Sequence, residues 1–513
     1  MYKLKFLLAL AFIMVSSVVF SQKFELNWQP EQKIKKNDRI GSVIGSDKNG
    51  YYMTKYSQSG FLFATYTTHI VRLNKQHEEE FRFDVPSKLH NKDLSLEGIY
   101  YINEQLFIFS SYDDKKADLK KLFVFPVSKS GVIGEEKQID EISYKDRKTK
   151  GTFIIKVLNE SKKILVIHEE GYTKKGNEDA KFLLYDFDFN LIWEEKIELP
   201  YKDKEFVIDG YLVDEENNVY IIGSREVKKL SQKKLIAYYV KSKKLEEANI
   251  NLKRVHKVSD LNYNLVNGLI QFTGFYFNEK GGIQGIVRES IDPKTLKSVS
   301  AKATPFDKKD ILKFATKRAA KKDKGIAFNY DIRQIIYEEN GDILLVAEGY
   351  QLIVTTSQDA RTGATRTTYT YYYWDIMVVR MDKEGEILWL QKVPKKQISM
   401  NDNGYYSSYL FVQDQNNFYF IYNTHFKNFS PKLKEDEKGE QVYAPSLKKG
   451  VIALTTLSKK DGKFESEIFK SASKDAKAKT IFAPKQSAWL NENEILVYGA
   501  FTRNFRLGII TVK

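Results

Sequence analysis

A tight polar turn recurs along the whole chain and constrains the fold more than any other feature. Each copy contains Asn, Gly or acidic residues, and Asn and Gly tolerate the positive φ that tight hairpins require. Successive copies are 50 to 77 residues apart. They occur at residues 47–50, 103–105, 159–161, 215–218, 267–268, 339–341, 415–417 and 491–493. A unit repeated at this spacing predicts an architecture built from similar small sheets.

The segments that follow these turns are short and apolar throughout, as in Ile164–Ile167, Val219–Ile222 and Ile343–Val346. Strands with one face in solvent alternate apolar and polar residues, whereas these runs suit strands buried on both faces. Sheets packed around a common axis provide that environment. We therefore predict an all-β protein, a β-propeller with four-stranded blades. Eight blades are expected, with seven as the alternative if the longer repeats are divided differently.

The two ends of the chain are expected to share the last blade. The eighth repeat ends with a third strand, Leu507–Val512, and no fourth strand follows it. Phe24–Trp28 resembles the Trp-ending fourth strands of earlier repeats, such as Leu191–Trp193. Closure by this N-terminal strand would cover edges that otherwise favour aggregation.

The N-terminus reads as an export signal over residues 1–21. Lys3 and Lys5 precede the apolar run Phe6–Val19, and serines follow it, ending at Ser21. The run is short for a membrane span, which favours a cleaved signal peptide over an uncleaved anchor helix. Residues 22–513 are then expected to form one propeller domain in the periplasm or at the cell surface, without a transmembrane segment.

The amino-acid composition limits the kinds of partner and metal site that the chain can have. The chain has no cysteine, which excludes a disulfide framework and thiolate metal sites. Its net charge of +15 is spread as lysine pairs. Such pairs either solvate strand edges or attract anionic envelope material. No nucleic-acid recognition motif is present, and neither a nucleic-acid partner nor a cofactor is expected.

Three insertions interrupt the later repeats. Residues 307–324 read as a short basic helix, either packed on the rim or contacting an anionic partner. Residues 426–445 are charged and read as a surface loop. Residues 351–375 read as a long hairpin whose aromatic side chains either bind a sugar or peptide or pack on a neighbouring blade. The candidate binding residues are Arg361, Arg366, Tyr369, Tyr371, Tyr373 and Trp374.

The sequence shows little sign of catalysis. The six histidines fall in different parts of the chain with no metal-ligand spacing, and no nucleophile or phosphate-binding motif is evident. A ring can nevertheless bring distant carboxylates together at its axis. The candidates are Asp209, Asp260, Asp331 and Glu348, with Asp331 and Glu348 preferred as a catalytic pair.

The stretch from Asn329 to Ser408 carries a resemblance to a family. It includes Asn329–Arg333, Tyr373–Val378, Pro394–Gln397 and Gly404–Ser408. These segments resemble the uncharacterised exported β-propeller-like proteins of Bacteroidetes. The resemblance implies an envelope location and brings no activity and no catalytic residues with it.

The function expected from the sequence is that of an exported, non-catalytic β-propeller that binds a protein or glycan partner in the cell envelope. A rigid ring with variable loops suits recognition. The alternative is a hydrolase acting on polysaccharide or peptide at the mouth of the ring. A third hypothesis is a structural part of an envelope complex.

Overall fold

The computed structural model of the chain consists almost entirely of antiparallel strands. None of the described helices is long and apolar enough to cross a membrane. The predicted signal segment, residues 1–21, lies outside the described residues. The structure describes residues 23–34, 38–59, 65–144, 150–159, 161–173, 176–227, 230–252, 257–315, 322, 324–327, 329–358, 360–429, 435–436, 439–440, 442, 444–445, 450–471 and 480–513.

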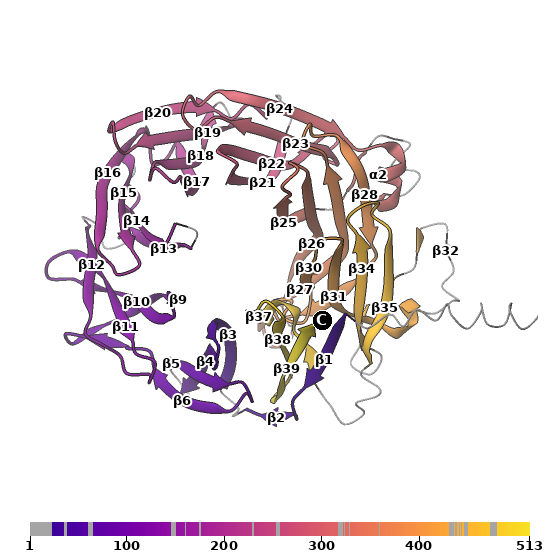
Figure 1. Ribbon diagram of the computed structural model, residues 1–513, viewed down its shortest axis with the longest axis horizontal. Helices are drawn as coiled ribbons and strands as arrows, with labels where there is room; N and C mark the ends of the chain where they lie inside the picture. Colours follow the sequence, from indigo (N-terminus) through magenta and orange to yellow (C-terminus); the bar gives the residue numbers. More distant parts are fainter. Residues whose placement is uncertain are drawn as a thin grey trace, which may run out of the picture.

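Eight sheets in the described part of the chain contain four or more strands each. We number them first to eighth in chain order, with the eighth containing the C-terminal strands. In the first seven, the four main strands follow one another across the sheet in chain order. Figure 1 shows the sheets arranged around a common centre, with the sequence colours changing steadily around it. The mostly-β, propeller-like architecture predicted from the repeats is therefore confirmed.

The first four sheets are regular. The first contains β3 (Asp38–Asp47), β4 (Gly50–Ser59), β5 (Thr65–Asn74) and β6 (Glu79–Asp84). The second contains β9 (Ser95–Ile102), β10 (Gln105–Asp114), β11 (Leu119–Val127) and β12 (Lys137–Ser143). The third contains β13 (Thr152–Leu158), β14 (Lys163–Glu169), β15 (Asn177–Asp186) and β16 (Leu191–Lys202). The fourth contains β17 (Phe206–Val213), β18 (Val219–Val227), β19 (Leu230–Tyr239) and β20 (Lys244–Asn249).

The later sheets carry additional strands. The fifth contains β21 (Lys257–Val266), β22 (Leu269–Phe277), β23 (Ile283–Ile291) and β24 (Ser298–Pro305). The sixth contains β25 (Tyr330–Tyr337), β26 (Ile343–Gln358), β27 (Thr365–Met381), β28 (Ile387–Val393) and β29 (Gln397–Met400). The seventh contains β30 (Leu410–Gln413), β31 (Asn417–His425), β34 (Gly450–Ser458) and β35 (Phe464–Ser471). The eighth contains β36 (Ile481–Phe482), β37 (Ala488–Asn491), β38 (Glu494–Phe501), β39 (Asn504–Val512), β1 (Phe24–Trp28) and β2 (Gln32–Lys33).

In the first seven sheets the recurring turn joins the first two strands, as predicted, and in the eighth it joins β37 and β38. Glu160, within one of these turns, lies outside the described residues. Asn267 and Gly268 adopt φ of 50° and 73°, and Asn103 and Glu104 adopt 48° and 60°. Consecutive positive φ values are the signature of the tight hairpin turn that matches strand twist. The turn residues therefore fix where each sheet begins.

The core lies between neighbouring sheets rather than within one of them. In β10, Leu106 to Tyr112 are all buried, so both faces of this strand are covered. Phe109 of the second sheet and Val166 of the third belong to one hydrophobic cluster. Burial of a large apolar side chain contributes about 1.5–3 kcal/mol, so these interfaces supply much of the stability. The continuous apolar runs in the sequence reflect this two-sided packing.

The two ends of the chain meet in the eighth sheet. β1 pairs antiparallel with β39, with Phe24 opposite Val512 and Trp28 opposite Gly508. Figure 1 shows indigo β1 beside yellow β39. Phe24 is fully buried, and its ring meets the edge of Tyr419 at 4.7 Å between centroids, which ties the N-terminal strand to the seventh sheet.

Two insertions are described in part. In residues 307–324, α2 (Lys308–Phe314) buries Ile311 and Phe314 in the cluster between the fifth and sixth sheets. The helix is thus a packed crossover. In residues 426–445, the described elements are the 3-10 turn η2 (Phe426–Phe429) and the two-stranded ribbon of β32 (Glu435–Asp436) and β33 (Gly439–Glu440).

Two further short elements complete the fold. β7 (Lys88–Leu89) pairs with β8 (Lys92–Asp93) between the first and second sheets. The 3-10 turn η3 (Pro484–Gln486) separates β36 from β37.

Candidate functional site

The hairpin predicted for residues 351–375 is present in the sixth sheet. β26 has 16 residues and β27 has 17, whereas the second strand of the fourth sheet, β18, has 9. Ile343–Gly349 is buried, and Gln351–Gln358 is exposed throughout. The change follows the sequence, where an apolar run gives way to a threonine-containing segment. The outer half of the hairpin therefore projects beyond the packed sheet.

β29 adds a third strand beside this projecting part. It pairs with β27, with Met400 opposite Thr370 and Gln397 opposite Tyr373. We call β29, Gln351–Gln358 and Thr365–Tyr371 together the extension. On its other side, β26 pairs with β25 only as far as Gly349, and no other described strand continues that pairing outward. The extension therefore presents an exposed strand edge, which is a template for pairing with another chain.

The predicted aromatic cluster is mostly packed within the protein. Tyr371 and Tyr373 are buried, and the Tyr371 hydroxyl donates to Asn403 Oδ1 at 2.7 Å. Tyr372 and Trp374 stack with their centroids 5.7 Å apart. The sequence left open whether these aromatic side chains bind a ligand or pack within the protein. For these four residues the structure shows packing within the protein.

The remaining candidates lie further out. Tyr369 is exposed, and so are Arg361 near the hairpin tip and Arg366 on the returning strand. Asp359, also at the tip, lies outside the described residues. The candidate binding residues thus divide into a packed base and an exposed outer part.

Aliphatic side chains contribute most to the apolar character of the extension. The residues singled out from the sequence were instead aromatic residues and arginines. Single exposed apolar residues are common on protein surfaces, but a contiguous group usually marks an interaction site. Strand register places these residues on β26 and β29, the two strands that pair with β27 from opposite sides. The exposed members are Leu352, Ile353, Val354, Ile398 and Met400.

The two preferred carboxylates do lie together. Asp331 and Glu348 are directly opposite one another on β25 and β26. Arg333 lies between them, with its Nη2 3.4 Å from Asp331 Oδ2 and its Nε 3.4 Å from Glu348 Oε2. Burial, followed by repulsion from Glu348, raises the pKa of Asp331 against the effect of Arg333. The pair is therefore bridged by a guanidinium group.

Glu348 is also held by a buried lysine. Lys395 Nζ lies 2.8 Å from Glu348 Oε1, and both side chains have no exposed surface. Ser408 Oγ donates to Glu348 Oε2 at 2.8 Å, and Lys395 Nζ donates to Gln397 Oε1 at 3.2 Å. Burial lowers the pKa of Lys395, although Glu348 opposes the shift. This arrangement is an internal ion pair within the sixth sheet, linked through Ser408 to the segment that leads into the seventh, and a substrate has no direct access to Glu348.

Asp209, another carboxylate candidate, has its described contacts elsewhere. Asp209 accepts hydrogen bonds from Ser224 Oγ at 2.7 Å and Lys233 Nζ at 2.9 Å, within its own sheet. The side chain of Asp260 lies outside the part that the structure describes. No group of three or more His, Asp or Glu side chains among the described residues is arranged to hold a metal ion.

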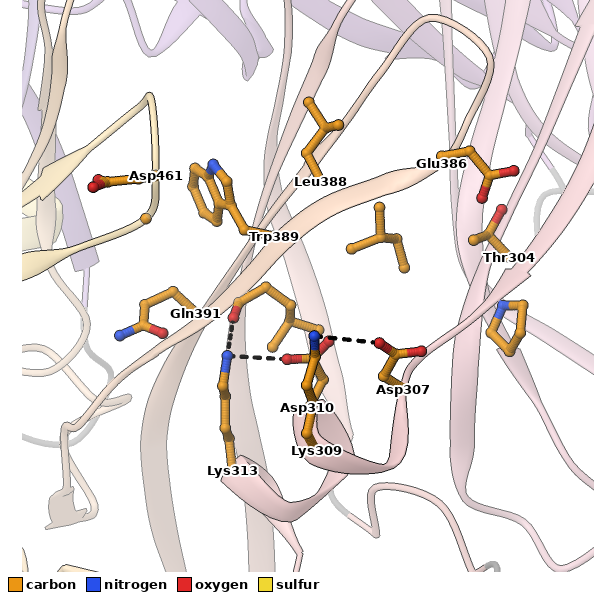
Figure 2. Close-up of a pocket in the computed structure, with 14 residues that line it drawn as sticks. Thr304, Asp307, Lys309, Asp310, Lys313, Glu386, Leu388, Trp389, Gln391 and Asp461 are labelled. Carbon is orange, nitrogen blue, oxygen red and sulfur yellow. Dashed lines mark hydrogen bonds and ion pairs between the residues drawn. The ribbon is translucent and has the colours of Figure 1, made fainter.

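A polar cavity of about 260 Å³ lies beside α2 (Figure 2). Lys313 bonds to Asp310 at 3.0 Å and to the carbonyl of Leu390, and Lys309 lies 3.5 Å from Asp307. Lys309 and Lys313, two of the three lysines of α2, are thus paired within the protein.

Comparisons with known proteins place the fold in a broad context only. No family model matches the sequence, and no curated protein matches it. The chain is similar to the β-propeller domain of the Trilobed protease from Pyrococcus furiosus, with a TM-score of 0.34 and 8% identity over 85% of this chain and 97% of that one. The Dos1 propeller gives 0.39 and 8% over 94% of each chain, and polysaccharide lyase Uly1 gives 0.33 and 9% over 95% and 100%. Similarity at this level carries no argument about function.

Proposed function

We propose that this chain is an exported eight-bladed β-propeller that binds another protein through the extension of its sixth blade. The eight sheets are the blades, and the N-terminal strand completes the last one. The observation that carries the proposal is the combination of exposed aliphatic side chains with an open edge on β26. Strand addition at such an edge provides main-chain hydrogen bonds, while neighbouring apolar side chains provide specificity.

The arrangement of side chains favours a protein over a glycan. Sugar binding uses open aromatic faces, but Tyr371 and Tyr373 are buried and Tyr372 stacks on Trp374. Leu352, Ile353 and Val354 instead offer apolar surface of the kind found at the centre of protein interfaces. Exposed Tyr369 adds an aromatic contact on the neighbouring strand.

The cell envelope is the proposed compartment. The support is the signal-like segment over residues 1–21. The net charge of +15 is compatible with an anionic surface nearby. Fractionation of the native host by osmotic shock tests this: the processed chain should appear in the periplasmic or surface fraction, and recovery in the cytoplasm would contradict export.

Site-specific photocross-linking tests the binding surface. A benzoylphenylalanine is placed at Val354 of the full chain, which is expressed in its native host and irradiated in intact cells. Val132, in the loop between β11 and β12 of the second sheet, is the matched control, because Val354 and Val132 are both exposed valines, at 52% and 64%. We expect a discrete protein adduct from position 354 and none of that size from position 132.

A substitution then separates specific binding from chance proximity. Ile353→Asp removes apolar contact and adds a charge, whereas Thr356→Asp adds the same charge to a residue that is already polar and exposed. Ile353→Asp should abolish the adduct and Thr356→Asp should retain it. An adduct unaffected by Ile353→Asp, or one that resists protease and contains carbohydrate, would refute a protein-binding extension.

A further inference from the structure

Three side chains of the first sheet form a continuous hydrogen-bonded chain. Ser57 Oγ lies 2.7 Å from His69 Nε2, and His69 Nδ1 lies 2.6 Å from Asp84 Oδ1. Each histidine nitrogen therefore has its own partner, with the hydroxyl on one side and the carboxylate on the other. This connectivity is the one by which a histidine activates a serine nucleophile.

Strand register creates the arrangement. His69 on β5 is directly opposite Asp84 on β6. On its other side, His69 is opposite Lys55 of β4, and Ser57 lies two positions further along the same strand. Residues two apart on a strand share a face, so all three side chains project from one face of the sheet. Paired strands are a rigid support for such a group.

From this geometry we propose that Ser57 is the nucleophile of a hydrolytic site for carboxylic esters, with His69 as the general base. Asp84 is a positioning residue that holds the imidazole in the correct tautomer. The constellation is recognised by geometry and not by fold or chain order, because the same three roles recur on unrelated scaffolds. The site is independent of the extension and of partner binding there.

The exposure of the group distinguishes it from a structural histidine. The His69 side chain is 14% exposed, the Asp84 side chain is 67% exposed, and Ser57 is half-buried. In contrast, His168 and Asp140 form a pair at 2.9 Å in which both side chains are buried. A substrate can approach Ser57 from solvent, and an interior pair of that kind could not receive one.

Lys55 supplies a positive charge beside the site. Its position opposite His69 places it on the same face, and its Nζ lies 4.0 Å from Asp38 Oδ2. A cation at this place favours the negative charge that develops on the carbonyl oxygen during attack. Arg82, the other basic group of the face, is engaged with Glu79 at 2.6 Å.

The proposed reaction has two steps. Ser57 Oγ attacks the ester carbonyl carbon and passes its proton to His69 Nε2; the C–O bond to the alcohol breaks, and the alcohol leaves with that proton. Water then attacks the acyl-serine, giving its proton to His69, and the carboxylic acid is released as Ser57 regains a proton. The exposed position of the group fits short acyl esters presented from solvent.

The test uses the folded full-length domain with p-nitrophenyl acetate and a fluorophosphonate probe. Ser57→Ala should reduce hydrolysis to the buffer rate, and His69→Gln should lower it by about 100-fold or more, which is the usual contribution of a general base. Mass spectrometry should locate the probe on Ser57. Asp84→Asn should lower kcat by up to about 10⁴-fold with little change in KM, because it changes the tautomer and orientation of the imidazole and not substrate binding.

Ser224→Ala is the matched control, because Ser224 Oγ bonds to the Asp209 carboxylate at 2.7 Å and to Lys233 Nζ at 2.6 Å, whereas Ser57 Oγ bonds to a histidine ring. It should leave hydrolysis and labelling unchanged, and circular dichroism should show that every variant is folded. Hydrolysis that survives Ser57→Ala, or probe labelling that is equal in the parent and His69→Gln, would overturn the proposal. Neither result would affect the binding function proposed for the extension.

Discussion

Substitution of Lys395 by Met should destabilise the protein strongly, even though methionine is a good replacement for a buried lysine stem. The ammonium group lies 2.8 Å from Glu348 Oε1, and neither side chain has exposed surface. Removing the Lys395 ammonium group leaves the Glu348 carboxylate buried without its closest positive charge. Breaking a buried ion pair from one side costs about 3–5 kcal/mol, because the remaining charge is desolvated without its partner.

The contacts that Glu348 keeps determine where in this range the loss of unfolding free energy should fall. Glu348 would keep the hydrogen bond from Ser408 at 2.8 Å and the contact with Arg333 at 3.4 Å. These two partners neutralise part of the remaining charge, so we expect a loss of about 3 kcal/mol, the lower limit of the range. The double variant Lys395→Met, Glu348→Met removes both charges, and should lose about 1.5 kcal/mol or less, because apolar replacements of buried pairs are often neutral.

Chemical unfolding followed by tryptophan fluorescence and far-ultraviolet circular dichroism provides the measurement. Lys395→Met, Glu348→Met and the double variant are compared with the parent at one pH, and the coincidence of both probes is checked first. Lys396→Met is the control, since Lys396 is adjacent in sequence but lies over the Trp374 ring at 5.6 Å. A double variant as unstable as the sum of the two single variants would refute the coupling between the pair.

Two further outcomes follow from other parts of the fold. Burial, followed by repulsion from Asp203 and Glu169, raises the pKa of Glu178 to about 7 from 4.5, so the folded state binds more protons between these values and stability falls as pH rises through them. Glu178→Gln should remove this fall and stabilise the protein at pH 8 by about 1 kcal/mol after solvent screening, as measured by unfolding at pH 5 and pH 8; equal pH dependence in both proteins would contradict it. Cysteines at Glu25 and Thr511, which are opposite one another on β1 and β39, should form a disulfide in this cysteine-free chain. The oxidised form should have a higher melting temperature than the reduced form, with a gain of up to about 6 kcal/mol from chain entropy; failure to oxidise would contradict the strand pairing.

The fold was accessible from the sequence because its determinants are local. Asn267 and Gly268 adopt the positive φ values that their turn requires, and the apolar run after each turn is buried on both faces. The pairing of Phe24–Trp28 with the C-terminal strand was also predictable, since an incomplete last repeat calls for one more strand. The extent to which the hairpin aromatics are packed was not predictable, because periodicity does not reveal what covers Tyr371.

The sites were harder to predict because they depend on register between strands. Lys395 and Lys396 are adjacent lysines that the sequence pattern does not distinguish, yet only Lys395 of the two is fully buried. Ser57 and His69 are 12 residues apart and His69 and Asp84 are 15 apart, spacings that match no motif. The sequence around His69 does not distinguish it from the other five histidines. Cross-strand alignment alone brings these three residues together.

The pairing of β1 with β39 imposes an order on biogenesis. β1 can pair with β39 only after β39 has been synthesised, so this pairing joins segments almost 500 residues apart in the 513-residue chain. Closing such a long loop is entropically costly and slows folding. Until β1 and β39 pair, the edge of β39 has no strand partner from β1, and an incompletely folded chain could bind chaperones or pair with other copies there.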